Sequence, residues 1–468
     1  MSYTKLDREM IKTLTNIVGE NNSRLDSESL DKYGRDYTED LVFNPELVLL
    51  AKTTEEVSQI AAYCNENCIP LTTRGSGTGL SGACLPVLGG VVLSLERMNQ
   101  ILEIDTKNHQ ATVEAGVINE NLQNAVQEKG LFYPPDPASK GSCTLGGNVA
   151  HSSGGPRCVK YGTTKDYILN LKMVLANGEI IHTGANVLKN STGYHLTQLI
   201  IGSEGTLGIV TEITVKLIPY PKYRTLMLAS FKDANDACAC VPSIFDAGVQ
   251  ASAIEFMDRK GVEWSVKSHS IPFDFADEKA FLLLELDAFN EHELMPQSEL
   301  VFEALEKHSV LNVLLADNSE TIEKFWKIRR SIGEVVKQHS IYKEEDTVVT
   351  RAYLPNLYEG VMKISEEYGF ETVCYGHAGD GNLHINILKN DLPDELWNSK
   401  LPIAIREIFK MCKSYGGTIS GEHGIGLVQK PYMDIMFSET QLNLMRGIKK
   451  TFDPNLILNP SKIFDFKN

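Results

Sequence analysis

The chain has 468 residues, of which 42% are hydrophobic and 23% charged, so it is long enough for two or three folded domains. Its formal net charge of −16, from 45 basic and 61 acidic side chains, argues against a general nucleic-acid binder, because phosphate groups would be repelled. No apolar stretch reaches the length of a membrane span and the first residues hold no signal-peptide core, which predicts a cytoplasmic protein, with peripheral attachment to a membrane as the alternative.

The first well-marked elements form a strand–helix–strand unit. Thr53 and Glu56 make a capping box ahead of an apolar stripe, which predicts a helix over residues 53–67. Strands are predicted on either side of it, over 47–50 and 69–73.

A glycine-rich loop over residues 74–83 follows. It contains Gly77-x-Gly79-x-x-Gly82, but Pro86 and further glycines come next, so the loop does not open the helix that a Rossmann fingerprint requires. Its glycines and small hydroxyl side chains nevertheless suit the close approach of a pyrophosphate. Those hydroxyls belong to Ser76, Thr78 and Ser81.

More glycine-rich segments follow a capped helix predicted over 119–129 and a rigid proline run over 133–137. Loops are predicted at 144–148, 151–155 and 202–208, the last of them before a strand over 209–217. Since plain turns rarely account for four such loops in one region, they favour a cofactor. Pro219 and Pro221 then mark a domain boundary.

Beyond the boundary the pattern changes to strand, helix, two strands, helix and strand, the order of a ferredoxin-like fold with an antiparallel sheet. These elements are predicted over 225–231, 233–246, 253–256, 280–287, 293–307 and 310–315. Further helices are predicted over 319–339, 393–415 and 439–452.

Two histidines and a glutamate suggest a metal site. After the turn at Asp380 the chain alternates apolar and polar residues, so His384 and Asn386 are expected on one face of a strand. His377 precedes the turn in a hairpin and can approach His384, and Glu422 could supply a carboxylate. Two imidazoles and a carboxylate suit a divalent ion, with Zn²⁺ favoured over Mn²⁺ or Fe²⁺. The simpler alternative is a pair of hydrogen-bonded histidines without a metal.

These motifs together resemble a known family. The segments 74–78, 134–137, 146–148 and 205–208 are similar to the FAD domain of the vanillyl-alcohol oxidase and p-cresol methylhydroxylase type. With Gly376-His377-Ala378-Gly379-Asp380-Gly381-Asn382-Leu383-His384 and Ser420-Gly421-Glu422-His423-Gly424, the chain resembles the FAD-linked D-2-hydroxyacid dehydrogenase branch. That branch includes glycolate oxidase catalytic subunits, D-lactate dehydrogenases and D-2-hydroxyglutarate dehydrogenases.

The resemblance implies an α+β protein with a two-subdomain FAD-binding domain over 1–220, a ferredoxin-like cap over 221–415 and a C-terminal segment over 416–468 that returns to the flavin. It implies non-covalent FAD, since Thr78 stands where some relatives carry a linking histidine. The expected FAD-binding residues are Arg74, Gly75, Ser76, Gly77, Thr78, Ser81, Gly82, Pro135, Asp136, Thr144, Gly146, Gly147, Asn148, Ser153, Gly154, Gly205, Gly208, Ile209, Val210 and Asn459.

The resemblance also assigns roles around the substrate. His423 is expected to be the base that takes the hydroxyl proton, while the flavin accepts the hydride. Arg329 and Lys343 match positions that bind substrate carboxylates in the hydroxyglutarate branch, and Arg351 matches a commonly basic position near the substrate. Asn386 is expected to hydrogen-bond the substrate or a metal-bound oxygen. Gly333 stands where the hydroxyglutarate branch tends to carry a hydroxyl, so D-lactate or glycolate is favoured and D-2-hydroxyglutarate is the alternative.

Two other classes of function remain open at this stage. A metal-dependent hydrolase would leave the glycine-rich loops unexplained, and an electron-transfer flavoprotein without substrate chemistry would not need Glu422 and His423. The nine cysteines include no Cys-x-x-Cys pair, so no iron–sulfur ligands are expected and the electrons must pass to a separate acceptor. An electron-transferring flavoprotein, an iron–sulfur subunit and a quinone are the candidates, and the oligomeric state is left open.

Overall fold

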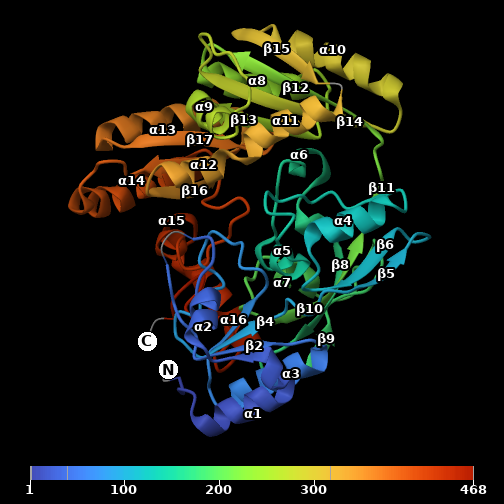
Figure 1. The fold of residues 1–468 in the computed structure, drawn as a ribbon, viewed down its shortest axis with the longest axis vertical. Coiled ribbons are helices and arrows are strands. Elements are labelled where there is room, and N and C mark those ends of the chain that lie inside the picture. The colour runs from blue at the N-terminus through green and yellow to red at the C-terminus, as the bar shows by residue number, and fades with distance from the viewer. Residues whose placement is uncertain (1–2, 39–40, 317, 467–468) are drawn as a thin grey trace. The chain divides into compact units, whose positions relative to one another are not determined.

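The computed structural model describes residues 3–38, 41–316 and 318–466. The chain divides into two compact units, each with its own core (Figure 1). The first unit comprises residues 1–154, 163–219 and 422–468, and the second comprises 155–162 and 220–421. The sequence-based division differs in three places, because residues 155–162, residue 220 and residues 416–421 pack with the second unit.

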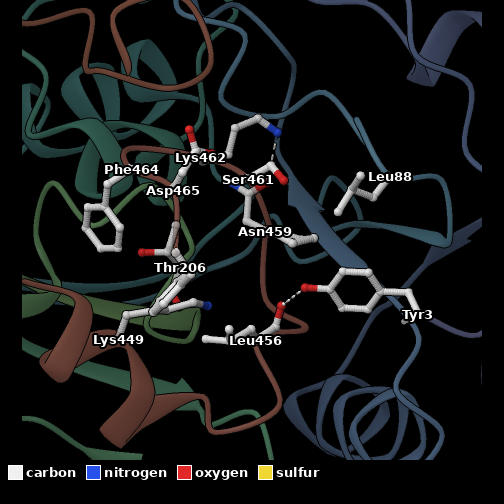
Figure 2. A pocket seen from close by; sticks show the side chains of 12 residues that line it. Tyr3, Leu88, Thr206, Lys449, Leu456, Asn459, Ser461, Lys462, Phe464 and Asp465 are labelled. Carbon is white, nitrogen blue, oxygen red and sulfur yellow. Dashed lines mark hydrogen bonds between the residues drawn. The ribbon is translucent and has the colours of Figure 1, made fainter. Parts of the chain in front are cut away.

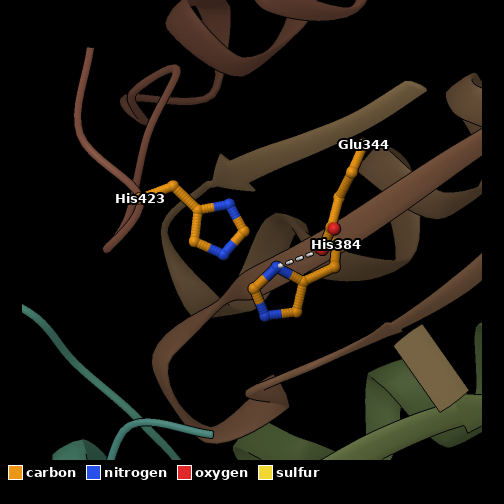
Figure 3. A group of neighbouring side chains, drawn as sticks. All are labelled: Glu344, His384 and His423. Atoms are coloured by element: carbon orange, nitrogen blue, oxygen red, sulfur yellow. Dashed lines mark ion pairs between the residues drawn. The ribbon is translucent and has the colours of Figure 1, made fainter. Parts of the chain in front are cut away.

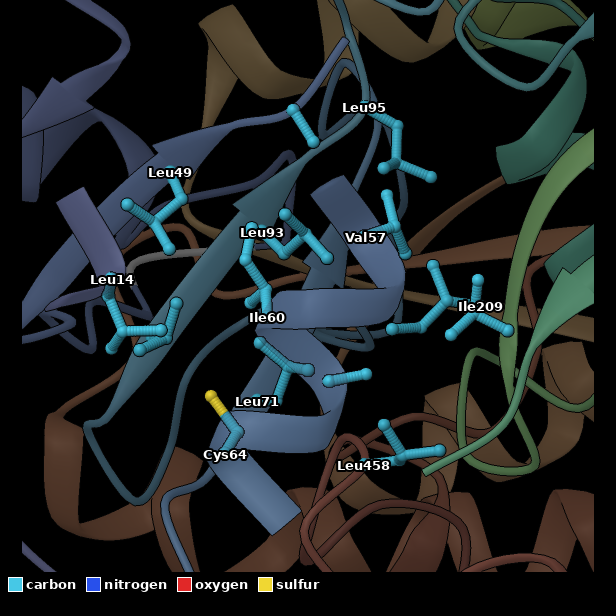
Figure 4. Close-up of a cluster of buried hydrophobic side chains, with 14 of the residues drawn as sticks. Leu14, Leu49, Val57, Ile60, Cys64, Leu71, Leu93, Leu95, Ile209 and Leu458 are labelled. Carbon is cyan, nitrogen blue, oxygen red and sulfur yellow. The ribbon is translucent and has the colours of Figure 1, made fainter. Parts of the chain in front are cut away.

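A small, mostly parallel sheet forms the core of the first unit. Its strand order is β1 (Ser23–Arg24), β2 (Leu47–Leu50), β4 (Val91–Ser94) and β3 (Leu71–Arg74), and β1 alone is antiparallel. Helix α3 (Thr54–Glu66) begins where the capping box predicts it: Thr53 Oγ1 accepts the N–H of Glu56, at 3.1 Å. The helix buries its apolar face against the sheet (Figure 4). Side chains that meet there are Val57, Ile60, Cys64, Leu49, Leu71 and Leu93.

The second sheet of this unit is antiparallel. Its order is β5 (Ile101–Asp105), β6 (Gln110–Glu114), β10 (Ile209–Lys216), β8 (Ile168–Val174) and β9 (Ile180–His182). Helix α4 (Asn119–Gln127) precedes the proline run, and β7 (Leu131–Phe132) pairs with β11 (Ile218–Pro219). Other helices of the unit are α1 (Arg8–Val18), α2 (Ser27–Tyr33), α5 (Leu145–His151), α7 (Leu196–Ile200), α15 (Met433–Met436) and α16 (Glu439–Phe452).

The prediction of a loop at residues 144–148 is wrong, because α5 begins there. Thr144 caps the helix, its Oγ1 accepting the N–H of Gly147 at 3.3 Å. A Cβ on Gly146 would lie 2.8 Å from Ala115 Cβ, so the glycine lets the helix approach the end of β6. The glycines therefore serve close packing of a helix start, not a turn.

A seven-stranded antiparallel sheet forms the second unit. Its order is β15 (Val310–Ala316), β12 (Tyr223–Phe231), β14 (Ala280–Ala288), β13 (Ala253–Asp258), β17 (Glu371–Gly376), β18 (Asn382–Leu388) and β16 (Tyr342–Val348). The first four strands, with α8 (Ala234–Asp246) and α10 (Leu294–Leu305), form the predicted ferredoxin-like unit, and the antiparallel sheet is confirmed. Helix α9 (Arg259–Ser268) was not predicted.

Helices cover both faces of this sheet. On one face lie α9, α11 (Ser319–Arg330) and α12 (Ile332–His339), around a core that includes Trp326 and Tyr375. The single helix predicted over 319–339 is broken at Ser331, whose Oγ donates to Ile328 O at 3.2 Å. On the other face α13 (Leu354–Tyr368) meets Phe256 through Tyr358, and α14 (Asp394–Ser414) packs on α13.

The remaining helix of the second unit is the short α6 (Cys158–Tyr161).

Within residues 3–38, 41–316 and 318–466, no helix combines the length and the hydropathy that crossing a lipid bilayer requires.

Candidate active site

Polar side chains gather on one face of the seven-stranded sheet, the face that α9, α11 and α12 cover. On β18, His384 lies opposite Asp346, and Asn386 lies opposite Glu344 of β16. Residues directly opposite one another in an antiparallel pair share a face, so these four side chains point the same way. His384 Nδ1 lies 3.6 Å from Glu344 Oε1 (Figure 3) and 3.7 Å from Asp346 Oδ1. The imidazole is therefore buried between carboxylates.

His377 lies at the end of β17 in the predicted hairpin and close to His384. Its carbonyl oxygen accepts the N–H of Asp380 at 2.9 Å and of Asn382 at 3.2 Å, which fixes the turn. The two imidazole rings are 5.3 Å apart between centroids and nearly perpendicular, at 85°. Each ring offers one nitrogen within 4.8 Å of the other's. The structure thus brings the two predicted metal-ligating histidines together.

The Nδ1 atom of His377 contacts a buried carboxylate. Its Nδ1 lies 2.9 Å from both carboxylate oxygens of Glu255, on β13. Glu255 Oε2 in turn lies 2.7 Å from Arg329 Nη2, and the Arg329 guanidinium lies 4.8 Å from the centre of the Tyr375 ring. Arg329, expected to bind substrate, is 6% exposed, and its Nε is buried without a hydrogen-bond partner among the described residues.

The other residues expected around the substrate, Lys343, Arg351 and Asn386, lie in three different surroundings. Lys343 pairs with Ile387, so the structure puts it on the sheet face opposite to His384 and does not bring it to the histidines. Arg351 Nε donates to Gly379 O at 2.8 Å, in the turn that follows His377, and burial lowers the pKa of its guanidinium. Asn386 is fully buried on the face of His384.

Asp346 anchors the segment that leads to Glu422. Its carboxylate accepts the Ser420 hydroxyl at 3.0 Å and the Gly421 N–H at 2.7 Å. A Cβ on Gly421 would lie 2.7 Å from Val348 Cγ2, so the close approach to β16 requires glycine. These contacts hold Ser420 and Gly421, the last residues of the second unit, against β16.

Glu422 and His423 open the last segment of the first unit. His423 Nε2 lies 4.0 Å from Glu422 Oε1. Two residues further on, the buried Glu204 carboxylate accepts the N–H of Ile425 at 2.7 Å and of Gly426 at 2.8 Å, and burial raises its pKa. This role of Glu204 was not predicted from the sequence, although the position of Glu204 inside a glycine-rich segment indicated a functional residue.

The residues expected to bind FAD are linked to one another in the first unit. A Cβ on Gly75 would lie 2.3 Å from Thr144 Oγ1, so the loop over 74–83 lies directly against the start of α5. Asn148 Nδ2 donates to Asn119 Oδ1 at 3.1 Å, and Asn119 Nδ2 donates to Pro135 O at 3.0 Å. The glycine loop, the proline run and α5 therefore meet at one place.

The C-terminal segment joins the same region. Asn459 Nδ2 donates to Ala83 O at 2.9 Å and to Glu204 O at 2.7 Å, which links the glycine loop to the segment containing Gly205 and Gly208. Arg74, also expected to bind FAD, holds the N-terminal segment: its Nη1 donates to Arg35 O at 2.5 Å and to Tyr33 O at 3.3 Å.

The same region fits a large polar cofactor. Among the described residues, the hydroxyls of Thr73 and Ser81 are buried without a hydrogen-bond partner. A Cβ on Gly205 would lie 4.0 Å from Thr73 Cβ, so the two residues line the same place. Buried hydroxyls without partners at a glycine-lined surface are what a ligand rich in oxygen atoms would satisfy.

A separate pocket of about 270 Å³ lies beside Asn459 (Figure 2). Its wall includes Tyr3, whose hydroxyl donates to Leu456 O at 2.7 Å, and the C-terminal Phe464. Of the residues expected to bind FAD, it contains Asn459 alone. The pocket is therefore distinct from the cofactor region.

Comparisons with known proteins agree with this arrangement. A family described as FAD linked oxidases, C-terminal domain, matches residues 220–463, and one described as FAD binding domain matches 45–184. The glycolate oxidase subunit GlcD of Bacillus subtilis (strain 168) is 38% identical, over 92% of each chain. A D-lactate dehydrogenase of Anaerostipes hadrus is 36% identical, over 92% of this chain and 93% of its own. A D-2-hydroxyglutarate dehydrogenase of Stutzerimonas stutzeri (strain A1501) is 34% identical, over 98% and 99%.

Solved structures show the same fold. A p-cresol methylhydroxylase with substrate bound superposes with a TM-score of 0.77 and 17% identity, over 98% of this chain and 97% of its own. An alkyldihydroxyacetonephosphate synthase gives a TM-score of 0.76 and 21% identity, over 98% and 87%. The prediction of an α+β fold of the p-cresol methylhydroxylase type is confirmed.

Proposed function

The chain belongs to the FAD-linked oxidase family and is an FAD-dependent oxidoreductase, and from this premise we propose that it oxidises a D-2-hydroxyacid to the 2-oxoacid. The names of its relatives support a hydroxyacid as the substrate class. Membership of an oxidoreductase family argues against a metal-dependent hydrolase. FAD, when bound, supplies the hydride acceptor at its N5.

The observation that carries the proposal is the pair His377 and His384, held together on a buried polar face. With Glu422 they offer two imidazoles and a carboxylate, a donor set that fits Zn²⁺ and also Mn²⁺ or Fe²⁺. Such an ion would supply a Lewis acid that lowers the pKa of the substrate hydroxyl. His423 takes the hydroxyl proton on a ring nitrogen, and Asn386 and Arg351 orient the acid.

Two features favour a short monocarboxylic acid, D-lactate or glycolate. Arg329, expected to bind a substrate carboxylate as in the hydroxyglutarate branch, is paired with Glu255 and lies against the Tyr375 ring. At Gly333 an added Cβ would lie 2.8 Å from the Tyr375 hydroxyl, so a hydroxyl-bearing side chain has no room there. Lys343, the other residue matched to that branch, lies on the other sheet face. D-2-hydroxyglutarate is the alternative substrate.

FAD is proposed to bind non-covalently where the glycine loop, α5 and the C-terminal segment meet. Thr78 offers no linking imidazole, so acid precipitation should release the yellow colour into the supernatant. Colour retained in the pellet would show a covalent link. The residues proposed to contact FAD are Arg74, Gly75, Ser76, Gly77, Thr78, Ser81, Gly82, Pro135, Asp136, Thr144, Gly146, Gly147, Asn148, Ser153, Gly154, Gly205, Gly208, Ile209, Val210 and Asn459, with Thr73 added by the structure.

The electrons are proposed to leave to a separate acceptor: an electron-transferring flavoprotein, an iron–sulfur subunit or a quinone. The nine cysteines are free thiols distributed over both units and form no ligand cluster for an internal acceptor among the described residues. A cytoplasmic location is proposed as well.

The test is anaerobic flavin reduction in a stopped-flow instrument, with D-lactate, L-lactate, glycolate and D-2-hydroxyglutarate as separate substrates. Fast bleaching by D-lactate or glycolate and none by L-lactate is expected. Fastest bleaching by D-2-hydroxyglutarate would replace the proposed substrate with the alternative. No bleaching by any of the four would overturn the proposed activity and favour an electron-transfer role.

A further inference from the structure

We propose that Glu255 is a positioning residue for the metal ligand His377, and that Arg329 balances the charge of Glu255. The three residues form a buried chain from a helix end through a carboxylate to an imidazole. The inference rests on the proposed function, because that function places a divalent ion on His377.

The contact between Glu255 and His377 decides which ring nitrogen carries the proton and which can bind a metal. Nδ1 lies 2.9 Å from each carboxylate oxygen, and an ionised carboxylate can only accept a hydrogen bond. The proton therefore sits on Nδ1, and Nε2 keeps the lone pair that a metal requires. Metal-ligating histidines commonly donate their second N–H to a carboxylate in this way, which orients the ring and raises its basicity.

Strand register delivers Glu255 to this place. Phe256 of β13 pairs with Gly376 of β17, so the preceding Glu255 comes level with His377, the residue after Gly376. Glu255 is 0% exposed, and a buried carboxylate without a cationic partner is strongly destabilising. Arg329, in the last turn of α11, provides that partner, with Nη2 2.7 Å from Oε2.

A purely structural ion pair is the competing explanation, and the same sheet supplies a control for it. Glu285 of β14 is also buried and also pairs with an arginine, Arg157, at 3.3 Å. Its carboxylate accepts the indole N–H of Trp326 at 2.9 Å and the Ser252 hydroxyl at 3.2 Å, and no histidine contacts it within the described part of the chain. Removing either carboxylate's charge should disturb the sheet similarly, whereas loss of Glu255 alone should disturb a metal on His377.

The experiment compares metal binding by FAD-loaded protein stripped of divalent ions. Co²⁺ is titrated into wild type, Glu255→Gln, Glu255→Asp and Glu285→Gln, and its visible absorption bands report both affinity and ligand geometry. Glu255→Gln should bind Co²⁺ about 10- to 100-fold more weakly, with altered bands. Glu255→Asp, which keeps the carboxylate but withdraws it by one methylene, should lose less affinity. Glu285→Gln should match wild type, and the FAD content should stay unchanged in all four.

The outcomes separate the inference from the function on which it rests. Wild-type Co²⁺ affinity and bands in Glu255→Gln would reduce Glu255 to a structural role and leave the proposed metal intact. Should Glu255→Gln fail to fold, wild-type affinity and bands in Glu255→Asp would overturn the inference equally. Equal losses in Glu255→Gln and Glu285→Gln would also overturn it. If wild type itself binds no Co²⁺, the metal of the proposed function fails, and the inference fails with it.

Discussion

His423 and Glu422 are neighbours in the chain that we expect to act differently. His423→Asn should retain FAD and metal but lose about 10²- to 10⁴-fold in the rate of flavin reduction, because one general base is removed. The acidic limb of the pH–rate profile should vanish with it. Glu422→Gln should instead weaken metal retention, with partial rescue by excess divalent ion, since an anionic ligand is lost. Metal lost from the first variant and kept in the second would exchange the two roles.

Lys462, close to Asn459, should make the stability of the protein depend on pH. Burial lowers its pKa to about 8, and its Nζ donates to Leu85 O at 2.5 Å. Since the unfolded chain holds the proton more tightly, the wild-type free energy of unfolding should rise, relative to Lys462→Met, as pH increases from about 8 to about 10.5. The gain should approach roughly 3 kcal/mol. Denaturant unfolding of both proteins from pH 7 to 10 measures it, and a constant difference would contradict it.

Sequence analysis found the residues of the site that lie close together in the chain. His377 and His384 are seven positions apart in one hairpin, so local periodicity was enough to predict their approach. Glu255 lies 122 residues before His377, and Glu204 lies 221 residues before Ile425. Such pairings depend on strand order and on the return of the C-terminal segment, and no local pattern in one sequence encodes them.

At the level of elements, capping and periodicity patterns predicted where helices form better than where a helix is interrupted. The capping box predicted the start of α3, but the break at Ser331 depends on contacts with another helix, such as Ser265 Oγ at 2.7 Å. The low helix propensity of glycine predicts a loop at residues 144–148, where α5 begins. The close packing of Gly146 against Ala115 decides the structure there. The three strands that extend the ferredoxin-like sheet to seven were not predicted as part of it.

Asp258, the N-cap of helix α9, should stabilise both α9 and strand β17. Asp258 Oδ1 accepts the N–H of Gly261 at 2.7 Å, capping α9, and Oδ2 accepts the N–H of Cys374 on β17 at 2.6 Å. Asp258→Ala should cost about 1 kcal/mol for the cap and a further 1–3 kcal/mol for the unpaired buried N–H. Asp233→Ala removes the exposed cap of α8 and is the control, with about 1 kcal/mol expected. Equal losses in the unfolding midpoint of the second unit would contradict the double role.

At the scale of the whole molecule, the two units carry separate spectroscopic reporters. The chain has three tryptophans, Trp264, Trp326 and Trp397, and all belong to the second unit. Trp326 is 2% exposed and Trp397 8%, so unfolding of that unit should change their fluorescence strongly. The residues proposed to hold FAD all lie in the first unit, and the release of FAD reports its unfolding.

FAD should therefore stabilise the first unit, and a metal bound chiefly by His377 and His384 should stabilise the second unit. A ligand present at a hundred times its Kd adds about 2.7 kcal/mol to the state that binds it. Removing FAD should lower the thermal midpoint of the first unit by roughly 5–10 °C, since 1 kcal/mol corresponds to about 2–4 °C in a domain of this size. Chelation should lower the tryptophan midpoint instead, because both imidazole ligands come from the second unit. Calorimetry of FAD-free and FAD-loaded protein measures the first shift, and tryptophan fluorescence of FAD-loaded protein with and without chelator measures the second. Chelation that moves the flavin signal and leaves tryptophan unchanged would exclude His377 and His384 as the principal metal ligands.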